Sequence, residues 1–389
     1  MTAASLASQP ADRAPAATRT LAAGCAIGAG ASWHITNAGA LAGTLADHYG
    51  TSLAVVGLLT SAMFLSELAM MVPAGRWIDR LGARETGLAG LVVAGLASAA
   101  LTAGGGIGVA IALRLVVGAG AILAFLGGAA YVQSAIGTSL AQGIYGGLGL
   151  ATSGIALVVV PLLAGPLGWR TPWAVAAVGT TACALLALAG PRLRAGAAGD
   201  ATSSFRLAAD PAIARLGALH AASFGFSVVL GNWTATLVDR AGFGDAFGGA
   251  VGALTLCLGV VARPAGGWLA RSGPVATRAV QAAGVVLGAT GGLMLCAAPG
   301  TAAAAVAGAA LVGFGGGLPF GTLFTGAARA HPQQVGTAMA AMNMYALVAV
   351  IVGIPLVGVT FALPGAGRIG FALASGACLA SLLVVRRVR

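Results

Sequence analysis

The chain has 389 residues, of which 58% are hydrophobic and only 7% are charged, whereas soluble domains carry about a quarter charged residues. This composition excludes an ordinary soluble domain, and the 63 glycines fit helices that pack closely within a bilayer. The net charge of +11 comes entirely from arginines dispersed between apolar runs. We therefore attribute it to membrane topology and not to binding of nucleic acid.

Residues 1–20 are polar and rich in Pro and Ala, and we expect them to form a disordered cytoplasmic tail. Beyond them lie twelve apolar stretches, each close to the roughly 20 residues that a spanning helix needs. They are 21–46, 51–74, 86–106, 107–131, 139–164, 173–190, 214–238, 245–262, 279–298, 301–327, 336–360 and 366–385. The longest polar interval, 191–213, has the composition of a loop. The sequence thus predicts an all-α integral membrane protein with six-helix bundles at 21–190 and 214–389 and a cytoplasmic central loop.

One decapeptide occurs twice, following the second apolar stretch of each predicted bundle. PAGRWIDRLG at 73–82 returns as PAGGWLARSG at 264–273, with six of ten positions identical. The acid does not return, since Ala270 stands where the first copy has Asp79. The repeat indicates two related halves, with the decapeptide marking the same loop in both.

The arginines predict the orientation in the membrane. Sixteen of the twenty, Arg263 among them, fall on the side of the N-terminus, three fall on the other side, and Arg114 lies within a span. Positive charge accumulates on cytoplasmic loops. We therefore expect both termini to be cytoplasmic, in a multi-pass protein of a bacterial cytoplasmic membrane.

Two motifs resemble those of the major facilitator superfamily. Gly75 to Arg84 resembles the family's loop signature of Gly, three variable residues, Asp, a basic residue, one residue, Gly and further basic residues. Ala83 departs from it at a frequently basic position. RLVVG, 114–118, is similar to the Arg-x-x-x-Gly pattern of the family's fourth helix. The resemblance covers nearly the whole chain and implies two pseudo-symmetric six-helix bundles that form a secondary transporter.

The resemblance also implies a latch that holds the two halves together on the cytoplasmic side. Its residues would be Gly75, Asp79, Arg80, Gly82 and Arg84, with Arg271 from the second copy. By its chemistry, Asp79 can pair with an arginine or accept backbone N–H groups at a helix start. The alternative is that both copies only shape loops and supply positive charge.

Ionisable residues inside a span are costly and point to function. A rise of about 1.5 Å per residue places Arg114 roughly 10 Å below the outer end of its span, at a depth similar to that of Asn37 and His34. The resemblance implies that these residues line a central cavity together with Asn232 and Trp233 of the seventh span. A guanidinium there would favour an anionic substrate. Alternatively, Arg114 binds backbone carbonyls and orders the fourth helix.

Glu67 lies deeper, about 24 Å below the outer end of the second span, which leaves roughly 14 Å between it and Arg114 along the membrane normal. Tyr145, Asn343 and Tyr345 fall at comparable depths. The resemblance implies that helices two and eleven meet, so Glu67 facing Asn343 would form a protonatable inner gate. The alternative is a glutamate that only bonds a neighbouring helix.

These observations predict a transporter working by alternating access, with proton-coupled uptake of a small, anionic solute. The alternative is proton-driven efflux of drugs or metabolites, which is less favoured because Val158 and Val159 stand where drug/proton antiporters usually carry Gly-Pro. The expected partners are a small-molecule substrate, protons and the lipid bilayer; a monomer suffices. The sequence has no catalytic constellation, and its five cysteines lack metal-ligand spacing, so we expect no enzyme, cofactor or metal site.

Overall fold

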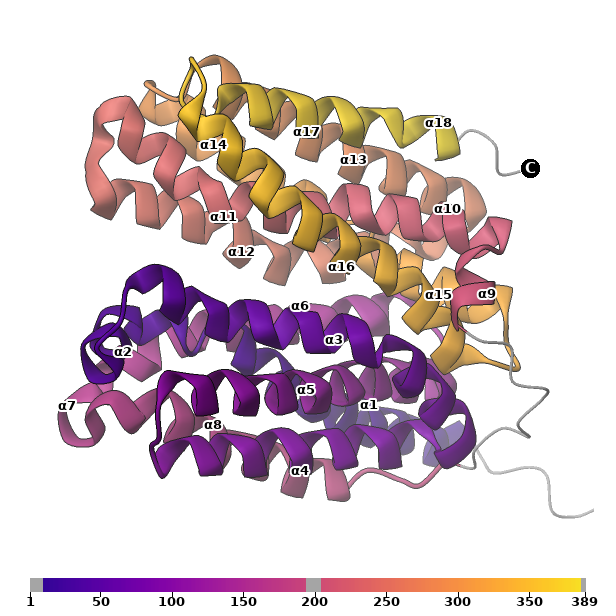
Figure 1. Ribbon diagram of the computed structural model, residues 1–389. Coiled ribbons are helices and arrows are strands. Elements are labelled where there is room, and N and C mark those ends of the chain that lie inside the picture. The colour runs from indigo at the N-terminus through magenta and orange to yellow at the C-terminus, as the bar shows by residue number, and fades with distance from the viewer. Residues whose placement is uncertain (1–9, 194–203, 386–389) are drawn as a thin grey trace, which may run out of the picture.

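The computed structural model describes residues 10–193 and 204–385, and within these ranges all regular elements are helices. Figure 1 shows them in two groups, one for each half of the chain. The first half holds α1 (Pro10–Ser32), α2 (Ala42–Tyr49), α3 (Leu53–Leu81), α4 (Ala83–Thr102), α5 (Ile107–Ala135), α6 (Ser139–Leu162), α7 (Ala164–Leu167) and α8 (Thr171–Leu188).

The second half holds α9 (Ser204–Ala208), α10 (Pro211–His220), α11 (Phe226–Val238), α12 (Gly244–Leu269), α13 (Pro274–Ala297), α14 (Ala302–Gly317), α15 (Phe320–Ala330), α16 (Val335–Val359), α17 (Arg368–Ala380) and α18 (Leu382–Val385). Within the described residues, ten helical segments are long and apolar enough to cross a membrane. The helices of the first and twelfth predicted stretches, α1 and α17, are not among them, and α17 has only 13 residues.

Three expectations about the helix ends need correction. The first predicted span, 21–46, is not continuous, because two 3-10 turns, Trp33–Ile35 and Gly39–Leu41, separate α1 from α2. α1 starts at Pro10, so 10–20 are helical here; proline suits a first helical turn because its missing N–H is not needed there. Residues 1–9 lie outside the described residues. The predicted central loop contains α9 and the start of α10, and its residues 194–203 also lie outside the described ranges.

The repeated decapeptide lies mostly inside helices. α3 continues through Pro73 to Leu81, and α12 continues through Pro264 to Leu269, several residues beyond the predicted span ends. Proline is tolerated in such helices because neighbouring groups satisfy the freed backbone. Each copy then ends in a turn at a glycine with positive φ, Gly82 at 102° and Gly273 at 117°. The predicted turn geometry is thus present in both copies.

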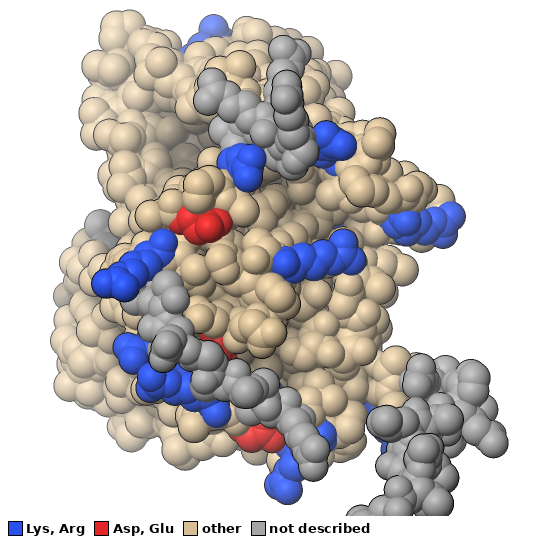
Figure 2. Space-filling model, turned by 90° about the vertical axis from the view of Figure 1, so that its right-hand side faces the viewer, with Lys and Arg blue, Asp and Glu red and all other residues tan. Residues whose placement is uncertain are grey.

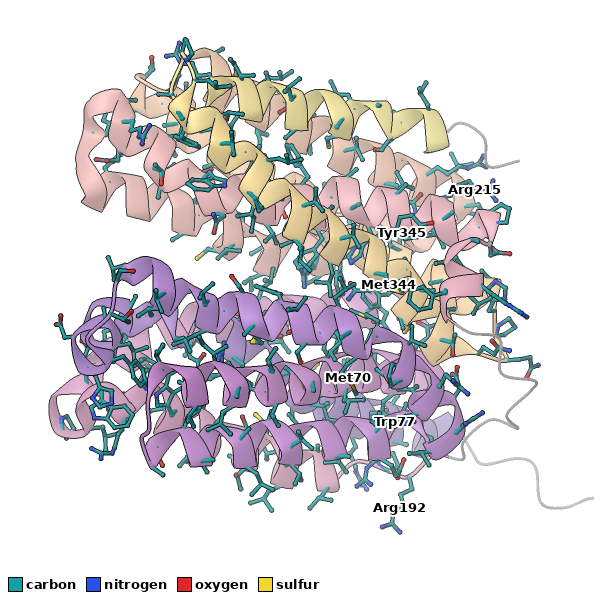
Figure 3. The ribbon with its side chains drawn as sticks, viewed as in Figure 1. Met70, Trp77, Arg192, Arg215, Met344 and Tyr345 are labelled. Atoms are coloured by element: carbon teal, nitrogen blue, oxygen red, sulfur yellow. The ribbon has the colours of Figure 1, made fainter. Side chains whose placement is uncertain are left out.

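The two halves meet where α3 and α6 of the first half contact helices of the second half. α3 packs against α16, and α6 packs against α12 and α15. The turn between α3 and α4, the chain after α8 and the loop between α15 and α16 line one pocket. They lie at one end of the molecule, on the right of Figure 1, which we call the arginine-rich end. Figure 2 looks onto this end, and arginines are spread across it with few acidic side chains. Trp77, Arg192 and Arg215 are labelled toward this end in Figure 3.

Gly118 of the RLVVG motif is required by the close approach of α5 to α3. A Cβ atom at this position would lie 2.3 Å from the carbonyl oxygen of Met63. No side chain can rotate to relieve that contact, because the atom belongs to the α3 backbone. We predict that Gly118→Ala lowers the melting temperature of the purified protein, by an overpacking cost of about 1 to 3 kcal/mol.

The matched control is Gly154→Ala on α6, where a Cβ would meet no atom within 4 Å. Alanine favours the helix over glycine, so this variant is expected to melt at the same or a slightly higher temperature. Equal melting curves for the two variants would contradict the close packing of α3 on α5.

Candidate functional site

A cavity of about 60 Å³ lies between the two halves. α1, α3, α5 and α6 line it from the first half, and α10, α12, α15 and α16 from the second. Its polar lining consists of Ser32, Glu67, His220, Arg263 and Asn343. The volume admits a few water molecules and no larger solute. A solute could therefore enter only if the halves move apart.

Arg263 of α12 brings a buried positive charge to this cavity. The side chain is 4% exposed, and its Nη1 donates to the carbonyl oxygen of Gly146 on α6, 2.8 Å away. The guanidinium carbon lies 4.1 Å from the ring centroid of Phe320 and 5.4 Å from that of Phe224. Its Nε has no hydrogen-bond partner, and no carboxylate pairs with it in the described part of the chain. The cationic side chain thus retains donors for an anion.

Glu67 of α3 supplies the acid on the opposite wall. It is 8% exposed and lines the cavity. Across residues 10–193 and 204–385 its carboxyl group takes part in no ion pair, and no hydrogen bond is found for it. A buried carboxyl group without a hydrogen bond or an ion pair is a candidate for proton binding, because neutralisation relieves the cost of burying its charge.

His220 and Asn343 join α10 to α16 at the same cavity. The His220 Nε2 and the Asn343 Oδ1 lie 3.0 Å apart. An amide oxygen only accepts, so Nε2 carries the proton in this bond. The other ring nitrogen, Nδ1, has no partner among the described residues. The ring also stacks on Phe224, with centroids 5.4 Å apart, so His220 is held in one orientation.

The residues of the predicted substrate site around Arg114 lie outside the lining of the central cavity. Arg114, Asn37 and His34 do come together, but Arg114 Nε donates to the Leu59 carbonyl at 3.0 Å and Nη2 to the His34 carbonyl at 2.9 Å. Asn37 Oδ1 lies 3.5 Å from Nη1, and Asn37 itself is fixed by the Pro172 carbonyl. None of the three lines the cavity. This geometry matches the alternative in which Arg114 orders helices by binding carbonyl groups.

The remaining predicted residues divide between the cavity and the helix packing. Asn232 is exposed, and the Trp233 indole donates to the Ile354 carbonyl at 2.8 Å within the second half. Of the predicted gate, Glu67 and Asn343 share the cavity. The two tyrosines are committed to backbone groups: Tyr145 Oη donates to Phe125 and Tyr345 Oη to Ala208.

Asp79 joins the two halves at the arginine-rich end. Its Oδ1 accepts from the Gly336 N–H at 2.7 Å, and its Oδ2 accepts from the Thr337 N–H at 3.0 Å and the Thr337 hydroxyl at 2.5 Å. These groups open α16, whose own N-cap residue, Gln334, makes no side-chain cap. A carboxylate at a helix N-terminus is stabilised by both the N–H groups and the helix dipole. Asp79 therefore caps α16 from the other half.

The arginines of the predicted latch do not pair with Asp79. Arg84 is buried and donates to the Leu188 carbonyl at 2.8 Å, while Arg80 is exposed. Arg271 lies over the ring of Trp268, 4.1 Å from its centroid. The sequence allows Asp79 either to pair with an arginine or to accept N–H groups at a helix start, and in the described residues it accepts N–H groups at the start of α16.

The second copy needs no acid, because its partner helix is capped within the same half. α6 begins at Ser139, and the hydroxyl oxygen of its N-cap Thr138 accepts from the Ala141 N–H at 3.2 Å. Gly267 packs directly on this start, since a Cβ there would lie 2.3 Å from the Ser139 carbonyl oxygen. Both copies thus place a glycine against a helix start of the other half, but Gly267 stands at the position of Arg76, and Gly266, the equivalent of Gly75, packs on Leu318 of its own half.

His220 and Arg263 were not identified as site residues from the sequence. The sequence predicts a loop position for Arg263 because its charge follows an apolar run, but α12 extends six residues beyond it. The repeat relates Pro264, which follows Arg263, to Pro73 of the first copy. Because α3 continues through Pro73, a helix that continues past Arg263 is consistent between the two copies. His220 was visible only as a lone histidine within a predicted span, which by itself does not indicate a site.

Removal of the Asp79 carboxylate should loosen the arginine-rich end. Loss of a helix cap costs about 0.5 to 2 kcal/mol. Here the loss destabilises the arrangement in which the two halves are in contact at this end. We predict that Asp79→Ala shifts the distance distribution between spin labels at the exposed positions 81 and 275, in a cysteine-free background, toward longer values. Asp47→Ala at the opposite end, also exposed, is the control, and an unchanged distribution for Asp79→Ala would refute the cap.

Comparison with known proteins places this geometry in a family. The Major Facilitator Superfamily profile matches residues 22–354. Among solved structures, the human organic anion transporter MFSD10 (TETRAN) superposes with a TM-score of 0.73 at 17% identity, covering 97% of this chain and 100% of that one.

FucP in its outward conformation gives a TM-score of 0.73 at 15% identity, with 94% and 97% of the two chains covered. A variant of the E. coli fucose:proton symporter FucP gives 0.68 at 15% identity, with 95% and 98% covered. A search of curated proteins finds no match. The TM-scores show a shared fold, and the profile match over most of the chain shows that the protein belongs to the major facilitator superfamily.

Proposed function

We propose that the protein is a proton-coupled importer of a small organic anion and works by alternating access. The observation that carries the proposal is the cavity between the halves, where Arg263 has no carboxylate partner and the Glu67 carboxyl group no described hydrogen bond. Secondary transport itself follows from the family. The substrate class, the proton and the direction are our inference from these side chains.

The lining of the cavity favours an organic over an inorganic anion. Phe64, Phe125, Phe224 and Phe320 contribute aromatic rings beside the single guanidinium of Arg263. Such a wall suits a carboxylate attached to an apolar body, since the ring faces bind the body and the guanidinium binds the carboxylate. The MFSD10 protein is described as an organic anion transporter and FucP as a fucose:proton symporter, so this fold accommodates both activities.

The arrangement of contacts supports an outward-facing or occluded state. Among the described residues, the hydrogen bonds we find between the halves lie at the cavity or toward the arginine-rich end; they join Asp79 to Gly336 and Thr337, Arg263 to Gly146, Arg329 to Gly137 and Asn343 to Met71. If the arginine-rich end is cytoplasmic, as the arginine distribution indicates, the contacts close the inner side. One chain supplies both walls of the cavity, so a monomer can complete the cycle.

Glu67→Gln tests whether Glu67 couples transport to the movement of a proton. Glutamine keeps the size and shape of the side chain and replaces one carboxyl oxygen with an NH2 group, so it cannot take up or release a proton in the working pH range. We expect the variant in reconstituted vesicles to lose accumulation driven by a pH gradient while keeping solute exchange, with the solute chosen as the carboxylate that most raises the melting temperature in a screen. Glu85→Gln, at a 40% exposed site beside Arg84, should accumulate normally. Normal accumulation by Glu67→Gln would remove the proton role.

Arg263→Gln tests whether Arg263 binds the anionic group of the solute. A hydrogen bond to a charged group contributes about 1.5 to 3 kcal/mol, so we expect affinity for the same carboxylate to fall at least roughly tenfold. Arg114→Gln provides the contrast: it should lower the melting temperature, because three helix contacts lose their donor, yet leave the affinity of the folded fraction unchanged. If Arg114→Gln lowers the affinity and Arg263→Gln does not, the anion binds at Arg114 and not at Arg263.

A further inference from the structure

A second, larger pocket of about 840 Å³ opens at the arginine-rich end. Four arginines line it: Arg215 of α10, Arg271 after α12, Arg278 of α13 and Arg329 of α15. Its lining contains no Asp or Glu. We call it the basic pocket. It is separate from the central cavity, with which it shares no lining residue.

The inner wall of the basic pocket is polar and buried. Gln281, Thr322 and Thr325 line it and are 7%, 2% and 1% exposed. The Gln281 Nε2 donates to the Thr322 hydroxyl at 3.3 Å, and that hydroxyl donates to the Pro319 carbonyl at 2.7 Å. The Thr325 hydroxyl has no hydrogen-bond partner among the described residues. An unpaired buried hydroxyl is costly, and a ligand in the pocket would satisfy it.

Three helices begin around the pocket, which adds to its positive potential. Ser139 opens α6, Ala212 lies in the first turn of α10, and Pro274 opens α13; all three line the pocket. Thr138 and Asp210 already cap α6 and α10, and Pro274 has no N–H group, so these three helix starts favour an anion through their dipoles. Asp210, just before α10, does not line the pocket. Its carboxylate accepts from the N–H groups of Ala212 and Ile213 and lies 3.6 Å from His331.

We propose that the basic pocket binds a phosphate group, held by the arginines at the rim and the Thr325 hydroxyl within. Guanidinium groups present paired donors that match phosphate oxygens. Clustered arginines around a pocket between membrane helices are suited to phosphate-bearing headgroups. Ala270 also lines the pocket, so the acid that the second copy of the repeat lacks would have stood on this wall.

The surroundings favour a phospholipid as the source of the phosphate. Trp268, Leu269 and Val275 next to the pocket are 47%, 46% and 76% exposed, and Leu140 on its wall is 36% exposed. Exposed apolar side chains beside a basic pocket fit acyl chains beside a headgroup. The ring of Trp268 under Arg271 is of the kind enriched at the level of headgroups. A soluble phosphate compound is the other source.

An occupant would connect the two halves. Thr138, Ser139 and Leu140 belong to the first half, whereas the arginines belong to the second. A phosphate bound between them stabilises the arrangement in which the arginine-rich end is closed. The ligand thus shifts the transport equilibrium in proportion to its preference for that arrangement. This inference depends on neither the anion nor the proton proposed for the central cavity.

The experiment measures the thermal shift and the bound lipid of the full chain in neutral detergent, with three probes: cardiolipin, phosphatidylcholine and inorganic phosphate. We expect cardiolipin to raise the melting temperature and to be retained in native mass spectrometry, and zwitterionic phosphatidylcholine to do neither. The variant Arg271→Gln with Arg329→Gln should weaken cardiolipin binding at least roughly tenfold. Thr325→Val, which keeps the shape of the side chain, should weaken it less but measurably.

The matched control is Arg192→Gln with Arg206→Gln, which removes the same charge from exposed positions outside the pocket. It should bind cardiolipin as the native chain does. A shift with millimolar inorganic phosphate, lost in the pocket variant, would support the site and assign a soluble ligand. Equal binding by the pocket and control variants, or no binding of either phosphate source by the native chain, would overturn the proposal.

Discussion

The carboxylate of Asp79 on the first turn of α16 is the constraint on which the closed end of this molecule depends. Two backbone N–H groups and a hydroxyl of the second half converge on one side chain of the first. α16 has no side-chain cap of its own. The halves and the helix start are therefore stabilised by the same bonds, and separation of the halves leaves both Asp79 and α16 without their partners. A contact with this property can act as a switch between two arrangements.

The two copies of the decapeptide solve the same packing problem with different chemistry. In each, glycine lets one helix end approach the start of a helix from the other half: Gly75 approaches Gly336 and Thr337, and Gly267 approaches Ser139. Where the facing helix lacks a cap, the decapeptide supplies Asp79. Where Thr138 already caps α6, the position is Ala270. The missing acid also leaves the adjoining basic pocket free of negative charge in its lining.

The sequence predicts those parts of the site that depend on local geometry. The turn at Gly82, the cap chemistry of Asp79 and the cluster around Arg114 could all be derived from spacing and depth. The sequence could not show which way Arg114 points, because α5 is apolar around its whole circumference and offers no polar face from which to read its orientation. The sequence misplaces Arg263 for a related reason: a charge next to an apolar run predicts the end of a helix, whereas Phe320 and the Gly146 carbonyl accommodate the guanidinium inside the bundle.

Arg114 and Arg263 show why burial alone does not identify a candidate transport residue. Arg114 donates to the carbonyl groups of Leu59 and His34 and is enclosed within one half, so motion of one half against the other leaves its bonds intact. Arg263 donates to Gly146 across the junction, so in the proposed transport cycle the same motion would break its bond and expose its charge. The cost of an unpaired guanidinium would then fall on the open state, where the proposed anion could offset it. An arginine whose partners change with the motion can therefore couple the motion to its ligand, and of these two only Arg263 lies across the moving surface.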